Sequence, residues 1–508
     1  MFNYLKTMPY LIKNSFLFCF IFIIQSAYAQ IPTGKVSSAD SLKAYKLSDI
    51  AIKFYKNGDF LSAKKQLDSA ININSKDSYI YYLRGLALYR LKRHDVSKND
   101  FDKAILLNPK KCGYYIDRAS LLISMKEYKA AQEDLLKAKS IDSLRLGIYK
   151  NLGKIYKEQG DYKQALLCFS KELRLHGNDP SLYWFRAETY YQLNKDSLAF
   201  ADIEKGISLK PIDIDIYYAS AIKIALKLNE FQSVVKYANL YLQLKPNDYN
   251  TQIALAEAYY YTGKYQEAIS TANTTESQPN FKDAKENYKV YYFRAAAKLE
   301  LKDYIGADKD ARTGIKLTPP NNKNELADHH LILMETHSRF GKDKEALIDA
   351  KAVIESYPDM SAPYGIIGYI ELGNKNFHNA IVNLSKAIEF SPDVAVYYVW
   401  RGDAENALKQ YANSKEDLSK AFSMPNNTLK DKTFVGLALV YEHENNYETA
   451  LSYATQGIKE FPKCTDLYSV RARIYYVMND KEAACRDLKA AKELGGKEEA
   501  NEYAKFCK

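Results

Sequence analysis

The sequence lacks the short motifs that mark common catalytic sites. It contains no GxGxxG, no Walker loop for phosphate and no GxSxG. The stretch HENNY at His443 begins like the helix of a zinc protease, but Tyr447 stands where the second histidine would be. Because no convergent acid, base or nucleophile is present, we expect a protein that is not an enzyme and that uses no cofactor.

Charge of one sign is not concentrated in any part of the chain. The formal net charge is +10, yet the lysines are spread along the sequence without a basic run or an Arg-Gly tract. Nucleic-acid binding proteins gather their basic residues on one face or in one segment. We therefore expect no nucleic-acid partner.

Long apolar runs are absent after the first segment of the chain. Lys6 and Lys13 precede an apolar run from Phe16 to Ile24, and residues 27–29 read AYA. This order is typical of a secretory signal peptide, and the run is short for a bilayer-spanning helix. We expect cleavage before Gln30 and an exported chain without a transmembrane span, with an uncleaved anchor as the alternative.

A repeat accounts for most of the chain. A small residue recurs, most often after 34 residues, at Ala63, Ser97, Ala131, Ala165, Ala199, Val234, Ala268, Ala307, Ala346, Ala380, Ser414, Ala450 and Ala484. When each unit is numbered from 1 to 34, with the first beginning at Ala44, small or apolar residues occupy positions 4, 8 and 11 and again 20, 24 and 27. Each set has the i, i+4, i+7 spacing of one helical face. With a short turn such as NGD at 57–59 between the sets, the unit predicts a helical hairpin.

The residue types at fixed positions indicate how the hairpins pack. Position 4 is Tyr in nine units, position 8 is Gly or Ala in eleven, and position 20 is Ala or Ser in twelve. Small residues let two helices approach closely, and the tyrosines fill the remaining space. Position 32 is Pro in seven units, and Pro ends the second helix because it has no N–H to donate.

A hairpin of 34 residues with this pattern resembles the tetratricopeptide repeat (TPR). The resemblance covers thirteen units from Ala44 to about Gly496, with departures in repeat 7 and in repeat 9. It implies an all-α fold, an α-solenoid of about thirteen hairpins that forms a right-handed superhelix. The first helices of the hairpins would line a concave groove, and a capping helix would close the C-terminal end.

The spacing of the units also gives the domain organisation. Two intervals of 39 residues place insertions at 271–289 and 318–328, which we expect to be hinges. In chain order we expect a signal peptide at 1–29, a flexible segment at 30–43, repeats 1–7 at 44–282, repeat 8 with its flanking insertions at 283–326, repeats 9–13 at 327–496 and the capping helix at 497–508.

One charged pattern is repeated within the units. Six units have Arg at position 7, and each of them has Asp at position 23, which lies on the opposite helix. Because the fork of an arginine fits a carboxylate, we expect six structural ion pairs: Arg84–Asp100, Arg118–Asp134, Arg186–Asp202, Arg294–Asp310, Arg401–Asp417 and Arg471–Asp487. Asp349 is the one position-23 Asp without such an arginine.

The cysteines point to one disulfide. Cys112, Cys168, Cys464, Cys485 and Cys507 follow the expected cleavage site, and an odd number leaves at least one thiol unpaired. In an oxidising compartment a bridge between Cys485 and Cys507 would hold the capping helix on the last repeat. Two small buried thiols are the alternative.

The segment DHHLILMETH at 328–337 is the one metal-like cluster. It puts His330, Met334 and His337 on one helical face. These are positions 4, 8 and 11, which form the packing face of the hairpin. We interpret them as core residues and predict no metal site, with a metal or other functional site as the less favoured alternative.

The resemblance to the TPR family also implies a binding groove. In the family, positions 2, 5, 9, 12 and 13 of the first helix face it, which places there Tyr79, Tyr82, Tyr89, Lys150, Lys154, Trp184, Tyr191, Tyr260, Tyr292, Tyr369 and Tyr476. Aromatics with polar tips are good contact residues; the alternative is that many of them fill contacts between repeats. Family members that grip a C-terminal carboxylate combine lysine at position 5 with asparagine at position 9, and no unit here has that pair.

We therefore expect a non-enzymatic scaffold that binds a protein or peptide partner, exported to the periplasm or associated with the cell envelope of a Gram-negative bacterium. The alternative is an accessory subunit that binds envelope polysaccharide or supports an envelope enzyme complex.

Overall fold

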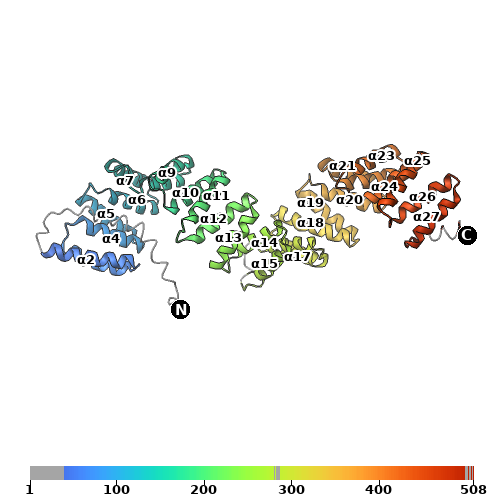
Figure 1. The fold of residues 1–508 in the computed structure, drawn as a ribbon. Helices are drawn as coiled ribbons and strands as arrows, with labels where there is room; N and C mark the ends of the chain where they lie inside the picture. The colour runs from blue at the N-terminus through green and yellow to red at the C-terminus, as the bar shows by residue number, and fades with distance from the viewer. Residues whose placement is uncertain are drawn as a thin grey trace. The chain divides into compact units, whose positions relative to one another are not determined.

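Helical hairpins follow one another along the whole described part of the chain (Figure 1). The computed structural model describes residues 39–279, 281, 286–497, 502, 505 and 507. The expected signal peptide and most of the expected capping helix lie outside these residues. Within them the helices α2 to α27 form thirteen hairpins, and no strand is present. The prediction of an all-α repeat architecture is confirmed.

The chain divides into two compact units, residues 1–258 and 259–508. The boundary falls within α14 (Tyr249–Tyr261). The N-terminal unit contains α2 (Ala39–Lys56), α3 (Phe60–Ile73), α4 (Ser78–Arg90), α5 (His94–Leu107), α6 (Cys112–Ser124), α7 (Tyr128–Ile141), α8 (Ile148–Glu158), α9 (Tyr162–Leu175), α10 (Pro180–Gln192), α11 (Asp196–Ser208), α12 (Ile214–Lys227) and α13 (Phe231–Leu244).

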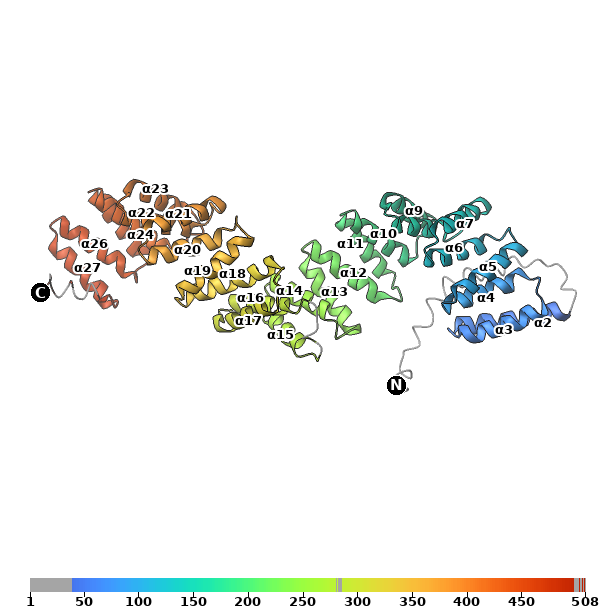
Figure 2. The same ribbon diagram turned by 180° about the vertical axis from the view of Figure 1, so that it is seen from behind.

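The C-terminal unit continues the same order of hairpins, seen from behind in Figure 2. It contains α15 (Tyr265–Glu276), α16 (Tyr288–Glu300), α17 (Tyr304–Leu317), α18 (Lys323–Arg339), α19 (Asp343–Ser356), α20 (Ser361–Gly373), α21 (Phe377–Phe390), α22 (Ala395–Ala407), α23 (Tyr411–Ser423), α24 (Lys430–His443), α25 (Tyr447–Glu460), α26 (Thr465–Val477) and α27 (Lys481–Glu493).

The core is formed where a small residue on one helix receives a ring from the other. A Cβ atom added to Gly153 on α8 would lie 2.5 Å from the Phe169 ring on α9, and Phe169 is fully buried. The regular spacing of small and aromatic residues in the sequence thus allows the two helices of a hairpin to pack closely.

The turn inside every hairpin has one residue with a left-handed backbone. This residue stands at position 15 of each unit. It is Gly58, Gly160, Gly263 and Gly341 in four units and lysine or asparagine in the other nine: Lys92, Lys126, Asn194, Asn229, Lys302, Lys375, Lys409, Asn445 and Asn479. A positive φ strains a residue that has a Cβ, so these nine turns are less stable than glycine would make them.

Two expected boundaries differ in the structure. Helix α2 begins at Ala39, so residues 39–43 are helical and not part of a flexible segment; Asp40 in the first turn favours this extension by interacting with the helix dipole. The second insertion lengthens α18 to 17 residues, because Pro319 and Pro320 stop the chain from continuing α17 while the following residues can extend the next helix.

Candidate binding surfaces on the first helices

The six expected ion pairs are present and connect the two helices of a hairpin. In each pair the arginine donates from Nε and Nη2 to both carboxylate oxygens over 2.6–2.8 Å. The remaining Nη1 donates to the second helix of the preceding hairpin, for example from Arg118 to Asp102 over 2.6 Å and from Arg401 to Ser385 over 3.0 Å. The arginines therefore also join neighbouring hairpins, so their role is structural.

Asp349 is held by two histidines in place of the missing arginine. His330 Nδ1 lies 2.7 Å from Asp349 Oδ1, and His337 Nδ1 lies 2.7 Å from Asp349 Oδ2. His337 and Met334 are buried. Among the described residues no group of three or more His, Cys, Asp or Glu side chains is placed to hold a metal ion. The cluster belongs to the packing of repeat 9.

Cys485 on α27 and Cys507 form a disulfide, with their Cα atoms 5.6 Å apart. Cys112, Cys168 and Cys464 are free thiols, each partly buried. Since Cys507 is one of the few described residues of the segment after Lys497, the disulfide attaches that segment to the last hairpin.

The N-terminal unit carries a basic and aromatic surface on its first helices, the Lys154 surface, formed by Lys150, Lys154 and Lys157 of α8 and Trp184 and Phe185 of α10. The Nζ atom of Lys154 lies 4.7 Å from the centre of the Phe185 ring, and the Nζ atom of Lys157 lies 5.3 Å from the Trp184 ring. The lysines follow one another at helical spacing, so their ammonium groups lie along one side of α8.

The three lysines differ in their partners. Lys150 Nζ donates to Asp179 Oδ2 over 2.8 Å and to Ser181 Oγ over 2.6 Å, so its charge is balanced. Among the residues that the structure describes, no carboxylate forms a hydrogen bond or an ion pair with Lys154. Burial, and then the charge of Lys150, lower the pKa of Lys154 to about 8. A half-buried ammonium group with aromatic neighbours and no paired carboxylate can bind an anion.

The surface continues onto α12. Trp184 Nε1 donates to Ser220 Oγ over 3.0 Å, which fixes the indole ring. The Tyr191 ring lies 4.0 Å from Lys223 Nζ and 4.7 Å from Lys227 Nζ. Lys227 is paired with Asp196, whereas the side chain of Lys223 is exposed.

Three predicted groove residues on α4 serve mainly in packing. Tyr82 is only 8% exposed, and its hydroxyl donates to Asp117 over 2.8 Å. Tyr79 stacks on Tyr82 with ring centres 6.0 Å apart, and Tyr89 is partly buried beside His94. Tyr82 is thus a contact between repeats and not a groove residue, because its ring packs against the Tyr114 ring of the next hairpin.

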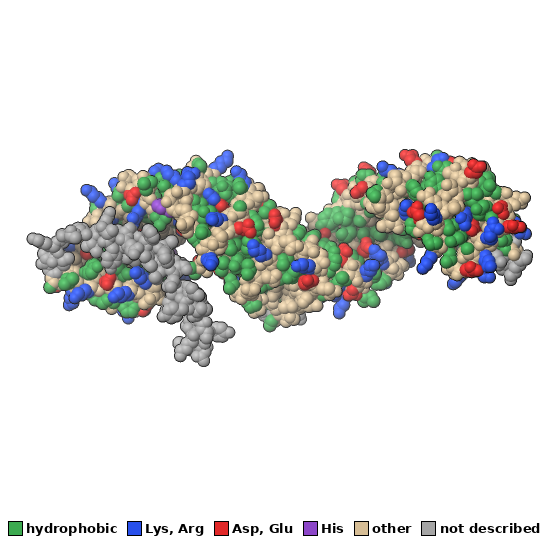
Figure 3. Space-filling view, in the orientation of Figure 1, with side chains coloured by type: hydrophobic (Ala, Val, Ile, Leu, Met, Phe, Trp, Pro, Cys, Tyr) green, Lys and Arg blue, Asp and Glu red, His purple; other side chains and the backbone are tan. Residues whose placement is uncertain are grey.

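The predicted groove residues of the C-terminal unit fall into two groups. Tyr260 and Tyr292 are half-buried, beside Phe293 and His329 respectively. Tyr369 and Tyr476 are 47% and 58% exposed. Tyr369 on α20 contacts Trp400 on α22 with ring centres 4.9 Å apart. On the face shown in Figure 3, basic and acidic side chains of this unit are interspersed with apolar ones.

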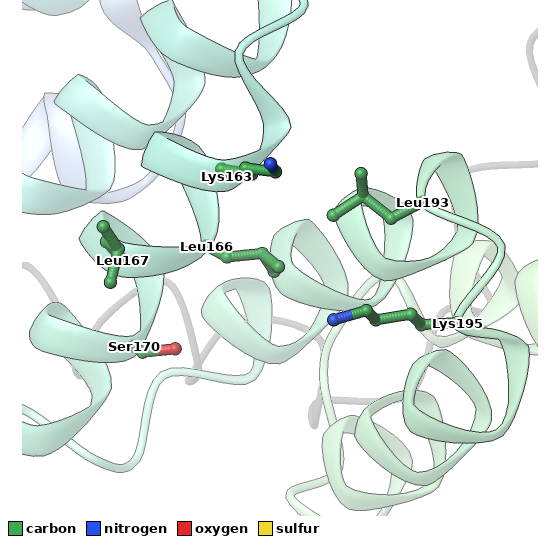
Figure 4. A pocket seen from close by; sticks show the side chains of 6 residues that line it. All are labelled: Lys163, Leu166, Leu167, Ser170, Leu193 and Lys195. Carbon is green, nitrogen blue, oxygen red and sulfur yellow. The ribbon is translucent and has the colours of Figure 1, made fainter.

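A shallow hollow of about 390 Å³ lies between α9, the second helix of repeat 4, and the turn that joins α10 to α11 in repeat 5. Lys163, Leu166, Leu167 and Ser170 of α9 line it on one side, and Leu193 and Lys195 of the next turn line it on the other (Figure 4). It presents leucine side chains with two lysines at the edge and lacks the converging polar groups of a specific small-molecule site.

Of the helices in the described residues, α2 to α27, none is both long and apolar enough to cross a bilayer.

Comparisons with known proteins match the repeat. Family models described as tetratricopeptide repeat match residues 78–111, 113–143 and 148–182. The Protein STIP1 homolog of Dictyostelium discoideum is 30% identical over 131 residues, which are 24% of this chain and 23% of that protein. Over 92% of this chain and 97% of the other, the structure of the APC/C hetero-tetramer Cut9–Hcn1 aligns with a TM-score of 0.41 and 10% identity. The structure of Pseudomonas aeruginosa pilF covers 43% of this chain and 100% of its own, with a TM-score of 0.39 and 18% identity.

Sequence reasoning missed two residues of these surfaces. Phe185 and Trp400 stand at position 6, which is not among the positions that face the groove in the family. The signal available in the sequence was tryptophan, because the chain has only two, one on each unit.

Proposed function

Because this chain is a tetratricopeptide-repeat protein, we propose that it is a non-enzymatic scaffold that holds a protein or peptide partner. We place the contact on the Lys154 surface and infer that the partner supplies a carboxylate from an acidic side chain. The observation that carries this proposal is the side chain of Lys154, which is half-buried beside Phe185 and is paired with no carboxylate among the described residues.

The surroundings of Lys154 favour the binding of a carboxylate. Burial of an unpaired charge destabilises the folded protein, and the lowered pKa of Lys154 is the sign of that cost. A carboxylate placed on Lys154 would remove the cost and gain a charge-assisted hydrogen bond. Trp184 and Phe185 would contact the apolar part of the same side chain.

The surface differs from a clamp for a C-terminal carboxylate. Lys150 at position 5 is already paired with Asp179 and Ser181, and position 9 is Lys154 in place of asparagine. An acidic side chain within a peptide satisfies a single unpaired ammonium group, whereas a chain terminus needs several converging donors.

We further propose that the scaffold works in the envelope of a bacterium, as a periplasmic or envelope-associated protein. The order of charged, apolar and small residues in 1–29 supports export, and so does the Cys485–Cys507 disulfide. Cell fractionation with N-terminal sequencing tests this: the mature protein should begin at Gln30 in the envelope fraction, and a cytoplasmic chain that retains Phe16 to Ile24 would contradict it.

A capture experiment tests the partner class. Purified wild-type protein, Lys154→Met and Lys163→Met are immobilised and exposed to envelope extract and, separately, to isolated cell-wall glycan. We expect protein partners that bind wild type and Lys163→Met but are lost with Lys154→Met. Retention of glycan with no Lys154-dependent protein would favour the polysaccharide-binding alternative.

A further inference from the structure

A second unpaired charge, of opposite sign, lies at the corresponding place in the C-terminal unit. Asp403 on α22 stands at position 9 of its repeat, as Lys154 does in repeat 4. Among the described residues, no side chain forms a hydrogen bond or an ion pair with Asp403. Burial raises the pKa of this carboxyl to about 7, and the charge of Lys432 offsets only part of the effect.

The residue of the neighbouring hairpin that faces Asp403 has no side chain, and Leu418 of α23 fills most of the space beside it. Tyr369 at position 9 of repeat 10 contacts Trp400 at position 6 of the next repeat. For Asp403 the corresponding residue is Gly436 on α24, and a Cβ atom added there would lie 3.6 Å from Asp403 Oδ1. Where the preceding pair has two rings in contact, this pair has a carboxylate over a glycine backbone.

The cation whose charge lowers the pKa of Asp403 is already engaged. Lys432 on α24 donates from Nζ to Asp466 on α26, and this bond raises the pKa of Lys432. Lys432 therefore moderates the potential at Asp403 but does not bind it.

Aromatic residues precede Asp403 on its own helix. Trp400 lies one helical turn before Asp403, so the two side chains share a face of α22. The Trp400 ring contacts Tyr369 at 4.9 Å and Tyr397 at 6.1 Å between centres, and Tyr369 is 47% exposed. An unpaired carboxylate one helical turn from a tryptophan can bind an ammonium or guanidinium group together with that ring, through charge and through the ring face.

We propose that Asp403, Trp400 and Tyr369 form a binding site for a cationic side chain, lysine or arginine, of a protein partner. The site lies on a different unit from the Lys154 surface and takes the opposite charge. The proposal rests on the scaffold function only in that the ligand belongs to a protein. The full chain would then bind an acidic side chain with its N-terminal unit and a basic side chain with its C-terminal unit.

The two tryptophans allow each surface to be followed separately. Since Trp184 and Trp400 are the only tryptophans, full-length protein with Trp184→Phe reports on the Asp403 site alone. The probe is pentalysine, acetylated at its N-terminus and amidated at its C-terminus, with pentaglutamate blocked in the same way as the charge control. Asp403→Asn removes the charge at nearly constant shape, and Asp393→Asn removes an exposed carboxylate from the turn before the same helix.

We expect pentalysine to change the Trp400 emission in a saturable manner and pentaglutamate to leave it unchanged. Asp403→Asn should weaken pentalysine binding about tenfold or more, and Asp393→Asn less than about twofold. Trp400→Phe, measured by calorimetry, should weaken binding by a smaller factor, because phenylalanine keeps the packing but offers a poorer cation site. Melting curves establish that each variant is folded.

Equal weakening by Asp403→Asn and Asp393→Asn would show non-specific attraction and overturn the proposal, as would the lack of a saturable Trp400 signal. Binding of cell-wall glycan at Trp400 that Asp403→Asn does not change would also overturn it in favour of a sugar site. Trp184 emission in Trp400→Phe protein, titrated with pentaglutamate, tests the Lys154 surface independently, so the two failures can be told apart.

Discussion

Arg118 donates two hydrogen bonds to Asp134, over 2.8 and 2.6 Å, from one helix of a hairpin to the other. A third bond runs from Arg118 to Asp102 of the preceding hairpin. The side chain of Asp134 is 7% exposed and that of Asp102 is 47% exposed. One arginine thus makes a buried contact within a repeat and a solvated contact between repeats.

The first prediction separates these two contacts. In double-mutant cycles of alanine substitutions, Arg118 and Asp134 should couple by about 1–3 kcal/mol, because the pair is bidentate and shielded from water. Arg118 and Asp102 should couple by about 0.2–1 kcal/mol, as exposed pairs do. Denaturant titrations measure both cycles. Strict additivity for Arg118 and Asp134 would show that the contact does not stabilise the protein.

The second prediction concerns the left-handed turn residue. Lys126 has φ of 62°, which costs a residue with a Cβ about 1 kcal/mol relative to glycine. Lys126→Gly should therefore raise the free energy of unfolding by about that amount. Lys137→Gly, in the exposed middle of α7, should lower it by about 1 kcal/mol. The idea fails if both substitutions destabilise equally in urea titrations.

The third prediction follows from a buried acid. Burial first, and then the charge of Asp417, raise the pKa of Glu405 to about 7 from 4.5. The native state therefore holds this proton over a pH range in which the unfolded chain has lost it, so the contribution is complete below pH 4.5 and disappears as the pH rises to about 7.

Glu405→Gln should consequently stabilise the protein at pH 8 by about 1–3 kcal/mol and change little at pH 4.5. The exposed Glu416→Gln is the control and should have an effect within about 0.5 kcal/mol at both values. Thermal melts at the two pH values check this, and a Glu405→Gln effect independent of pH would refute the assigned protonation.

The fourth prediction concerns the disulfide. Cys485 and Cys507 are 22 residues apart in sequence, and a bridge that closes such a loop contributes about 2–4 kcal/mol. Cys485→Ser should speed hydrogen exchange in α26 and α27 and leave the N-terminal unit unchanged, whereas Cys168→Ser, a free cysteine of the N-terminal unit, should leave the exchange of α26 and α27 unchanged. If non-reducing peptide mapping finds both cysteines free, the bridge is absent.

The 34-residue period of the sequence was sufficient to predict the hairpins and the contacts between the two helices of each hairpin. A 34-residue register determines which positions of one hairpin face each other, so Arg118 could be paired with Asp134 without a structure. Contacts between hairpins depend on how each hairpin is rotated against the next, and the spacing of the repeats does not determine that rotation.

For that reason the bond from Arg118 to Asp102, the burial of Tyr82 and the unpaired carboxylate of Asp403 could not be derived. The histidines of repeat 9 were correctly placed on the packing face, but their shared partner Asp349 was not recognised, because histidine at positions 4 and 11 replaces arginine at position 7.

The Lys154 surface is tested most directly by calorimetric titration of the full-length protein with blocked pentaglutamate at low salt. The blocked ends remove the terminal carboxylate, so only side-chain carboxylates can bind. Lys154→Met keeps the apolar stem of the side chain, and Lys163→Met removes an exposed lysine from α9.

We predict saturable binding that Lys154→Met weakens about tenfold or more and Lys163→Met by less than about twofold. Because the pKa of Lys154 is about 8, wild-type affinity should fall between pH 7 and pH 9 as the ammonium group loses its proton, and the affinity of Lys154→Met should not. Equal affinities for wild type and Lys154→Met at pH 7 would contradict the assignment of this surface as the binding site.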